Sequence, residues 1–276
     1  MMGFIPYEVT AQDKRDFERD GYWISPKLID DETIEKLRLA HERIWASDFD
    51  GDGYPMHDVR IPENKIALRK HDNGWWINDE VKHVVTHPDL GRMSADLIGE
   101  SSIRLWHDQV IYKPSAAGQE TMAGNVGWHQ DYGFWKCSST SNMVTVWIAL
   151  QDTDLSNGGM RTILGSHKWG VVEGSAAFFD QDLDGLKQKF SGLGEWKDEP
   201  CILKAGQASF HHGLTFHGSG PNLSEQPRLS IVAHLMPGDT VYKSGRGRHD
   251  NVRLIGPRPY DGQPFNNEYF PLLYSR

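Results

Sequence analysis

The amino-acid sequence predicts a mainly β fold, an antiparallel sandwich or barrel, with α-helices packed around its outside. The first part of the chain, about residues 1–100, is mostly helical in pattern. After Glu100 the sequence changes to short runs rich in strand-forming residues, at 103–112, 143–150, 160–164, 208–212 and 229–236. Clusters of Gly, Asn and Pro separate these runs, which is typical of antiparallel strands in a sandwich or barrel.

Capping residues predict where the helices of the first part begin. Thr10 can cap a short helix, because a threonine side chain accepts a hydrogen bond from the backbone of a first helical turn. Asp30 or Asp31 can cap a longer helix that ends near Trp45. A third helix is expected over 89–98.

The length of the chain predicts a single domain. A chain of 276 residues can bury one large core, so we expect one domain over 1–276. Its parts would be a helical part at about 1–100, a β core at about 101–240 and a tail at about 241–276. The tail is basic within an acidic chain and could recognise a carboxylate or phosphate, but a flexible solvated tail is the expectation, for Lys243, Arg246, Arg248, Arg253 and Arg258.

Charge and cysteine content narrow the function classes. The formal net charge of −9 argues against binding of nucleic acid or of an anionic membrane. Cys137 and Cys201 are the 2 cysteines, too few for a disulfide framework, which favours a reducing compartment. The first residues lack the pattern of a signal peptide, and no apolar run approaches the roughly 20 residues of a membrane span. We expect a cytoplasmic protein with a small-molecule substrate, either a monomer or a homodimer.

Three residues have the types and spacing of a metal site. His129 and Asp131 lie two positions apart in the run Trp-His-Gln-Asp-Tyr, and in an extended strand such positions project to the same side. With His217 they supply two imidazoles and one carboxylate, the facial triad that leaves positions open in non-haem Fe(II) oxygenases. Metal ligands placed on several short strands suit a double-stranded β-helix, or jelly roll, with helices outside. His211 and His212 are nearby alternatives for the third ligand, and the polar residues that follow His217 favour His217.

An arginine after His217 strengthens the metal hypothesis. Arg228 lies in the run Pro-Arg-Leu-Ser-Ile-Val-Ala-His-Leu, which is typical of a buried strand. A buried arginine needs an anionic partner, and its planar guanidinium fits a carboxylate through two parallel hydrogen bonds. The sequence therefore predicts an anionic partner for Arg228, and a carboxylate would fit its guanidinium.

At these residues the chain resembles the phytanoyl-CoA dioxygenase (PhyH) family of Fe(II)- and 2-oxoglutarate-dependent oxygenases. The resemblance rests on His129-x-Asp131 and on the pattern His217-x-Ser219-x-x-Asn222-x-Ser224-x-x-x-Arg228. It extends through 144–150 and Asn157-Gly158-Gly159 to Gly165-Ser166-His167-Lys168. The family usually has a proline before that last segment, where this chain has Leu164, and this difference concerns a turn and not the chemistry.

The resemblance implies cofactors and residue roles. Fe(II) would be held by His129, Asp131 and His217, 2-oxoglutarate would be the co-substrate, and O2 would be consumed. Arg228 would bind the distal carboxylate of 2-oxoglutarate, and Ser219 would contact the same carboxylate. Trp147 would line the co-substrate pocket, and Thr145 would donate a hydrogen bond to 2-oxoglutarate.

Candidate substrate contacts precede and follow the metal motif. His107, Gln109, Ile111 and Lys113 alternate onto one face of a predicted strand, and family resemblance favours His107 and Gln109 facing the pocket. The competing interpretation is that Lys113 points to solvent and the others only pack. Further candidates are Phe134, Trp135 and Arg161.

The expected function is oxidation, by default hydroxylation, of an unactivated C–H bond of a small molecule, with release of succinate and CO2. One alternative is a cupin-like metal-binding isomerase or sensor without 2-oxoglutarate, which would not need Arg228 and Ser219. Another alternative is an acyl-CoA hydroxylase. Coenzyme A carries several phosphates, and the net negative charge of the chain is weak evidence against such a substrate.

Overall fold

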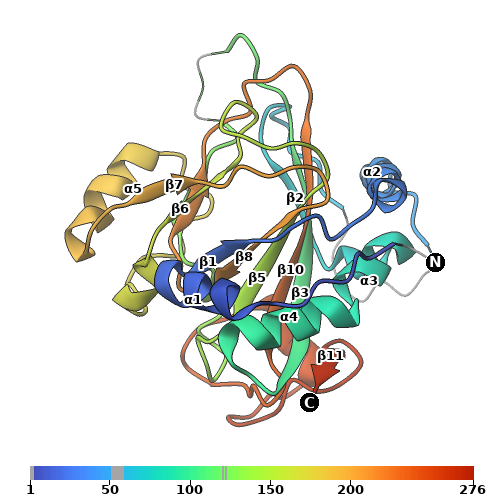
Figure 1. Ribbon diagram of the computed structural model, residues 1–276, viewed down its shortest axis with the longest axis vertical. Helices are drawn as coiled ribbons and strands as arrows, with labels where there is room; N and C mark the ends of the chain where they lie inside the picture. Colours follow the sequence, from blue (N-terminus) through green and yellow to red (C-terminus); the bar gives the residue numbers. More distant parts are fainter. Residues whose placement is uncertain (1–2, 51–58, 120, 122) are drawn as a thin grey trace.

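The protein forms two antiparallel sheets with helices on the outside (Figure 1). The computed structural model describes residues 3–50, 59–119, 121 and 123–276. Over these residues the larger sheet has seven strands in the order β1-β8-β5-β10-β3-β11, with β2 also paired to β3. The smaller sheet has four described strands in the order β4-β9-β6-β7. The prediction of a mainly β fold with outer helices is confirmed.

The strands of the larger sheet are β1 (Tyr22–Ile24), β2 (Arg69–Asp72), β3 (Ser102–Lys113), β5 (Val144–Ala149), β8 (Ala208–His212), β10 (Arg228–Pro237) and β11 (Leu272–Ser275). Those of the smaller sheet are β4 (Val126–His129), β6 (Met160–Ile163), β7 (Asp198–Pro200) and β9 (His217–Ser219). All five predicted runs are strands. The first hundred residues are less purely helical than expected, because β1 and β2 join the larger sheet.

The helices of the described residues are α1 (Ala11–Asp20), α2 (Asp31–Trp45), α3 (Asp79–Val85), α4 (Pro88–Ile98) and α5 (Leu183–Phe190). Thr10 caps α1 and Asp30 caps α2, as the sequence predicts. The helix α3 was not expected; it begins after Asn78, whose side chain accepts a hydrogen bond from the Val81 amide at 3.0 Å. None of the helices in the described part is long and apolar enough to span a membrane.

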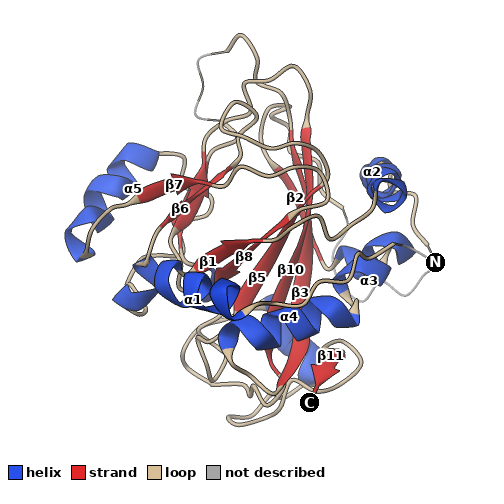
Figure 2. Cartoon of the chain, in the orientation of Figure 1, coloured by secondary structure: helices blue, strands red, loops and turns tan. Residues whose placement is uncertain are grey.

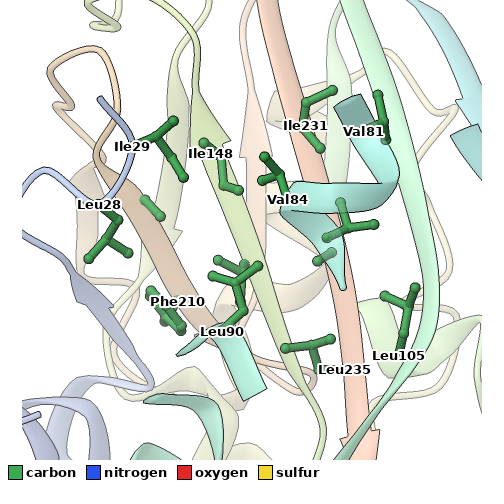
Figure 3. Close-up of a cluster of buried hydrophobic side chains, with 14 of the residues drawn as sticks. Leu28, Ile29, Val81, Val84, Leu90, Leu105, Ile148, Phe210, Ile231 and Leu235 are labelled. Atoms are coloured by element: carbon green, nitrogen blue, oxygen red, sulfur yellow. The ribbon is translucent and has the colours of Figure 1, made fainter. Parts of the chain in front are cut away.

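The main hydrophobic core lies between the helices and one face of the larger sheet. Figure 2 shows α1, α3 and α4 along one side of that sheet. Leu90 of α4 and Val84 of α3 pack with Ile148, Ile231 and other apolar side chains of the strands (Figure 3). Burial of each such side chain contributes about 1.5–3 kcal/mol. The helices therefore anchor the sheet from one side only.

The opposite face of the same strands points toward the smaller sheet. Because side chains alternate along a strand, the neighbours of the core residues Ile231, Ala233 and Leu235 face the other way. Val232 and His234 accordingly line a cavity between the two sheets. The larger sheet thus has one face for stability and one face for a site.

The tail is part of the fold, which corrects the expectation of a flexible solvated segment. β11 pairs with β3, and Phe265 and Phe270 are fully buried. The ring of Phe270 stacks on Trp106 of β3 with 5.5 Å between ring centroids. The apolar residues of the tail therefore indicate its packed structure better than its basic residues do.

Candidate metal and co-substrate site

The candidate site is a narrow cavity of about 50 Å³ between the two sheets. The larger sheet contributes Gln109, Trp147, Arg228 and other residues, and the smaller sheet contributes Met160 and the histidine pair described next. Strands far apart in the sequence therefore meet at this cavity.

The predicted metal ligands meet at one end of the cavity. β4 and β9 are antiparallel with His129 opposite His217, which places the two imidazoles 4.1 Å apart, centroid to centroid. The Asp131 Oδ1 atom lies 3.4 Å from His129 Nε2 and 3.7 Å from His217 Nε2. One ligand atom from each residue lies within 4.8 Å of the others. Distances of this size fit three ligands around one ion.

The local backbone differs from the expected strand. β4 ends at His129, and Asp131 begins a short 3₁₀ helix, η2 (Asp131–Gly133). Gln130 between them keeps an extended conformation, with φ −105° and ψ 131°, so the two flanking side chains still project to the same side. His129 and Asp131 therefore project to the same side, as the sequence predicts, although the strand ends at His129.

Backbone carbonyls select the imidazole tautomer that a metal needs. His129 Nδ1 lies 2.7 Å from the Gly127 carbonyl oxygen, and His217 Nδ1 lies 3.0 Å from that of Thr215. A carbonyl only accepts, so each Nδ1 carries the proton and donates it, which leaves the Nε2 lone pairs facing Asp131. This donor set suits Fe(II), and the hydrogen bonds behind it are those that orient metal-binding histidines.

Burial and mutual contact also favour the metal-binding charge states. Burial and the neighbouring His129 lower the pKa of His217 well below its ordinary value, so its imidazole is neutral. Burial alone would raise the pKa of Asp131, but the surrounding imidazoles, His217 first, hold it well below its usual range. A metal binds neutral imidazole and ionised carboxylate, the states that these shifts favour for His217 and Asp131.

The other oxygen of Asp131 is held from the larger sheet. Thr145 Oγ1 donates to Asp131 Oδ2 at 2.6 Å, and His234 Nδ1 lies 2.8 Å from the same Thr145 oxygen. His211 Nε2 lies 3.3 Å from Asp131 Oδ2. His211 is therefore beside the carboxylate and outside the triad, as the sequence suggests. Thr145 lines the cavity, but its proton is directed to Asp131.

The predicted carboxylate-binding residues lie farther along the cavity. Arg228 is 3% exposed, its guanidinium lies 4.9 Å from the Trp147 ring centroid, and its Nε has no hydrogen-bond partner. Lys113 stands opposite Arg228 in the pairing of β3 with β10 and is fully buried. Its Nζ donates to Ser219 Oγ and to the Gly220 carbonyl oxygen, each at 2.6 Å.

The interpretation that the Lys113 side chain points to solvent is wrong, because the residue is fully buried. Burial lowers the pKa of Arg228 to about 10, and burial and the nearby Arg228 lower the pKa of Lys113. Neither side chain forms an ion pair with any described residue. Buried cations without a carboxylate partner are costly, so this end of the cavity is built to receive an anion.

A second cavity of about 120 Å³ adjoins the first and shares Gln109, Asp131 and Phe178 with it. The predicted substrate contacts His107, Gln109, Phe134 and Trp135 all line this second cavity. Arg161 does not join them. It is partly exposed and its Nε donates to Asp198 at 2.8 Å, away from the three cavities.

An outer groove of about 480 Å³ continues from the second cavity, with Asp72, Phe134 and His249 lining both. Arg248 of the tail also lines this groove. The shared side chains connect the metal ligands to the surface by one path.

Phe178 is a site residue that the sequence analysis missed. Its ring lies 5.2 Å from the His129 ring, and it lines both inner cavities. The segment that carries it is fixed to β4, because the Gly127 amide donates to the Phe178 carbonyl oxygen at 3.1 Å. Gln130 holds the start of the same segment through Gly170 and Val172. No sequence spacing marks Phe178, since this contact depends on how a loop folds back.

The unusual Leu164 also has a structural explanation. Its amide donates to the Lys197 carbonyl oxygen at 2.9 Å, a bond that proline could not form. Gly165 follows with φ 73°, the left-handed conformation that glycine adopts readily. The turn in this chain is therefore formed with a leucine at position 164.

Comparison with known proteins agrees with this geometry. The profile of the family "Phytanoyl-CoA dioxygenase (PhyH)" matches residues 17–230. The peroxisomal phytanoyl-CoA dioxygenase of Rattus norvegicus is 24% identical over 250 residues, 87% of this chain and 72% of the relative. A probable alpha-ketoglutarate-dependent hypophosphite dioxygenase of Stutzerimonas stutzeri is 28% identical over 251 residues, 89% of this chain and 85% of the relative.

Solved structures show the same fold. The non-heme alpha ketoglutarate dependent carbocyclase SnoK from nogalamycin biosynthesis has a TM-score of 0.74 at 21% identity, covering 96% of both chains. The epimerase SnoN, in complex with Fe3+, alpha ketoglutarate and nogalamycin RO, has a TM-score of 0.71 at 23% identity and covers 95% of this chain and 97% of that one. The expected double-stranded β-helix class is thereby confirmed.

The family match covers most of the chain and spans the proposed metal ligands, Ser219 and Arg228. It confirms the resemblance seen in the motifs, and it decides against the cupin-like alternative without 2-oxoglutarate. The protein belongs to the phytanoyl-CoA dioxygenase family and is an Fe(II)- and 2-oxoglutarate-dependent dioxygenase.

Proposed function

We propose that this enzyme hydroxylates an unactivated C–H bond of a small molecule, with Fe(II) held by His129, Asp131 and His217. The observation that carries the proposal is the convergence of two Nε2 atoms on Asp131 Oδ1, with both Nδ1 atoms hydrogen-bonded to carbonyls. Bound iron, with 2-oxoglutarate and O2, supplies the oxidising power for C–H cleavage, and the co-substrate leaves as succinate and CO2.

The buried cations orient the co-substrate. The guanidinium of Arg228 can form two parallel hydrogen bonds with the distal carboxylate of 2-oxoglutarate. Ser219 Oγ accepts from Lys113 at 2.6 Å, so its own proton is free to donate to that carboxylate. Trp147 forms a wall against the guanidinium. The arriving anion offsets the cost of the two buried positive charges.

The second cavity binds the substrate. Phe134, Trp135 and Phe178 offer aromatic walls, and no described residue hydrogen-bonds the Gln109 side chain or the buried His107 Nε2. Lys70 and Asp72 at the same cavity pair with each other at 2.6 Å, so they add little net charge. These features favour a small molecule with an apolar body and hydrogen-bonding groups over a highly charged substrate.

The acyl-CoA class is the second candidate. The outer groove of about 480 Å³ has room for a longer substrate, and Arg248 could contact a phosphate there. Named relatives act on different compounds, among them one called ectoine dioxygenase from Streptomyces avermitilis, 25% identical over 248 residues. The family name therefore does not specify the substrate.

A succinate-release screen tests the proposal. The protein is supplied with Fe(II), ascorbate and 2-oxoglutarate, and small-molecule pools and an acyl-CoA panel are added separately. Stimulation by a small-molecule pool supports the proposal, and stimulation by acyl-CoA alone replaces it with the second candidate. Release that never depends on added iron would overturn the metal assignment.

Location and partners are part of the proposal. Two buried cysteines without a disulfide, Cys137 and Cys201, fit a reducing compartment, so we place the enzyme in the cytoplasm. The net charge of −9 supports a small molecule as partner, with neither nucleic acid nor membrane, and the enzyme acts as a monomer or homodimer.

A further inference from the structure

The two oxygens of the Asp131 carboxylate have different surroundings. Oδ1 faces the imidazoles of His129 and His217, at 3.4 and 3.7 Å. Oδ2 faces the larger sheet, where Thr145 Oγ1 lies at 2.6 Å. The carboxylate is 6% exposed as a residue, so water has little access to either oxygen. Its orientation is therefore decided by its protein neighbours.

The direction of the hydrogen bonds around Thr145 follows from counting protons. A hydroxyl has one proton, and an ionised carboxylate only accepts, so Thr145 donates to Asp131 Oδ2. The bond of 2.8 Å to His234 must then run the other way, with His234 Nδ1–H donating to Thr145 Oγ1. Both residues are buried, at 1% and 3% exposed.

The sheet fixes this arrangement. Thr145 of β5 and His234 of β10 are direct partners in the antiparallel pairing, so their side chains lie together on the cavity face. Threonine is branched at Cβ and has few rotamers, which limits the movement of its hydroxyl. His211 stands on the other side of Oδ2, at 3.3 Å.

We propose that Thr145, held by His234, is a positioning residue that keeps Asp131 a ligand through Oδ1 alone. The proposal rests on the function proposed above. Three protein ligands and the keto acid of 2-oxoglutarate would together fill five positions of a six-coordinate ion. A carboxylate that bound through both oxygens would occupy the position that O2 needs, so Asp131 Oδ2 would have to stay away from the metal. Thr145 thereby acts on the coordination number and does not touch the co-substrate.

The test uses Co(II) as an oxygen-stable probe of the metal site. Thr145→Val keeps the branched shape and removes the donor, Thr145→Ser keeps the donor, and His234→Phe removes the residue that holds it. Thr240→Val is the matched control, because Thr240 is equally buried at 1% and its hydroxyl bonds only the Pro237 carbonyl oxygen. Metal affinity is measured by calorimetry and coordination by the visible spectrum of the Co(II) protein.

We expect Thr145→Val to weaken Co(II) binding about 10- to 100-fold and to change the shape of the spectrum. Thr145→Ser should keep the Co(II) affinity and the spectrum of the wild type. His234→Phe should change the affinity and the spectrum in the same direction as Thr145→Val, but to a smaller extent. Thr240→Val should change neither the affinity nor the spectrum. Loss of affinity with an unchanged spectrum would assign Thr145 a merely structural role and overturn the proposal. So would a Thr145→Val protein that matches the wild type.

The result separates this proposal from the proposed function. A wild-type protein that binds no Co(II) would overturn both. A wild type that binds Co(II) and then 2-oxoglutarate, with Thr145 variants that behave identically, would overturn the positioning role alone. If Thr145→Val does not fold, the comparison of His234→Phe with wild type decides in the same way.

Discussion

Arg228 and Lys113 are direct partners across β10 and β3, and both are buried. Arg228 lines the metal cavity, and Lys113 lies behind its wall, where it donates to Ser219. Two like charges side by side without an acid repel each other and are poorly solvated. A dicarboxylate co-substrate removes this disadvantage. The affinity for 2-oxoglutarate is thus expected to depend on both residues.

Arg228→Ala should raise the 2-oxoglutarate requirement strongly and leave metal binding nearly unchanged. Loss of one partner of a buried, hydrogen-bonded charge pair costs roughly 2–5 kcal/mol, about thirty-fold to several-thousand-fold in affinity. Succinate release is measured against 2-oxoglutarate concentration. The control is Arg161→Ala, because Arg161 is partly exposed and pairs with Asp198 outside the cavity. Equal curves for the Arg228 variant and wild type would contradict the assignment.

Lys113→Met should weaken 2-oxoglutarate binding about tenfold or more without a large loss of stability. Methionine keeps the length of the side chain, and removal of a buried charge offsets the lost hydrogen bonds to Ser219 and Gly220. Thermal unfolding and calorimetry with the metal-loaded protein measure the two effects. A lower unfolding temperature with unaltered 2-oxoglutarate binding would mean that Lys113 is only structural.

His217→Ala should abolish stoichiometric Fe(II) binding, whereas His211→Ala should retain one Fe(II) per chain with reduced affinity. His217 contributes a ligand atom to the triad, whereas His211 lies outside it, beside Asp131 Oδ2 and the ring of His217. Anaerobic titration with Fe(II) gives stoichiometry and affinity for both variants. Unchanged binding by His217→Ala would show that the third ligand lies elsewhere.

Gly127→Ala should displace the segment that carries Phe178 and lower activity more than stability. A Cβ at this position would lie 2.1 Å from the Ala177 carbonyl oxygen and 2.5 Å from that of Asp180, too close for either to remain. Gly192→Ala is a suitable control, because nothing lies within 4 Å of its added Cβ. Proteolysis of the segment and succinate release are compared, and a fully active, protease-resistant variant would refute the close packing.

The wild-type protein should lose stability as the pH rises from about 4 to about 8, and Asp108→Asn should make this loss smaller. Burial raises the pKa of Asp108 to about 8, so the folded protein holds a proton that the unfolded chain releases near pH 4. The native state then binds more protons across this interval, and stability falls as pH rises. Unfolding temperatures of both proteins at pH 5 and pH 8 measure the difference. Parallel changes in the two proteins would count against a protonated Asp108.

The metal ligands could be predicted from the sequence because His129 and Asp131 are close in the chain and His217 has a recognisable polar segment after it. Lys113 and His234 could have been placed by counting alternate positions along β3 and β10, but only with the register of the two strands in hand. Phe178 and the tail residue Phe270 could not be placed in this way. Their positions depend on long-range packing, which local spacing does not encode.

The division of β10 into two faces has a consequence for how such enzymes diversify. Ile231 and Leu235 belong to the core beneath the helices, whereas Val232 and His234 line the reaction cavity. A substitution on the cavity face can change what reacts without disturbing the packing that keeps the sheet folded. Selection can therefore act on chemistry and on folding through separate residues of one strand, which allows a single scaffold to acquire new substrates by small steps.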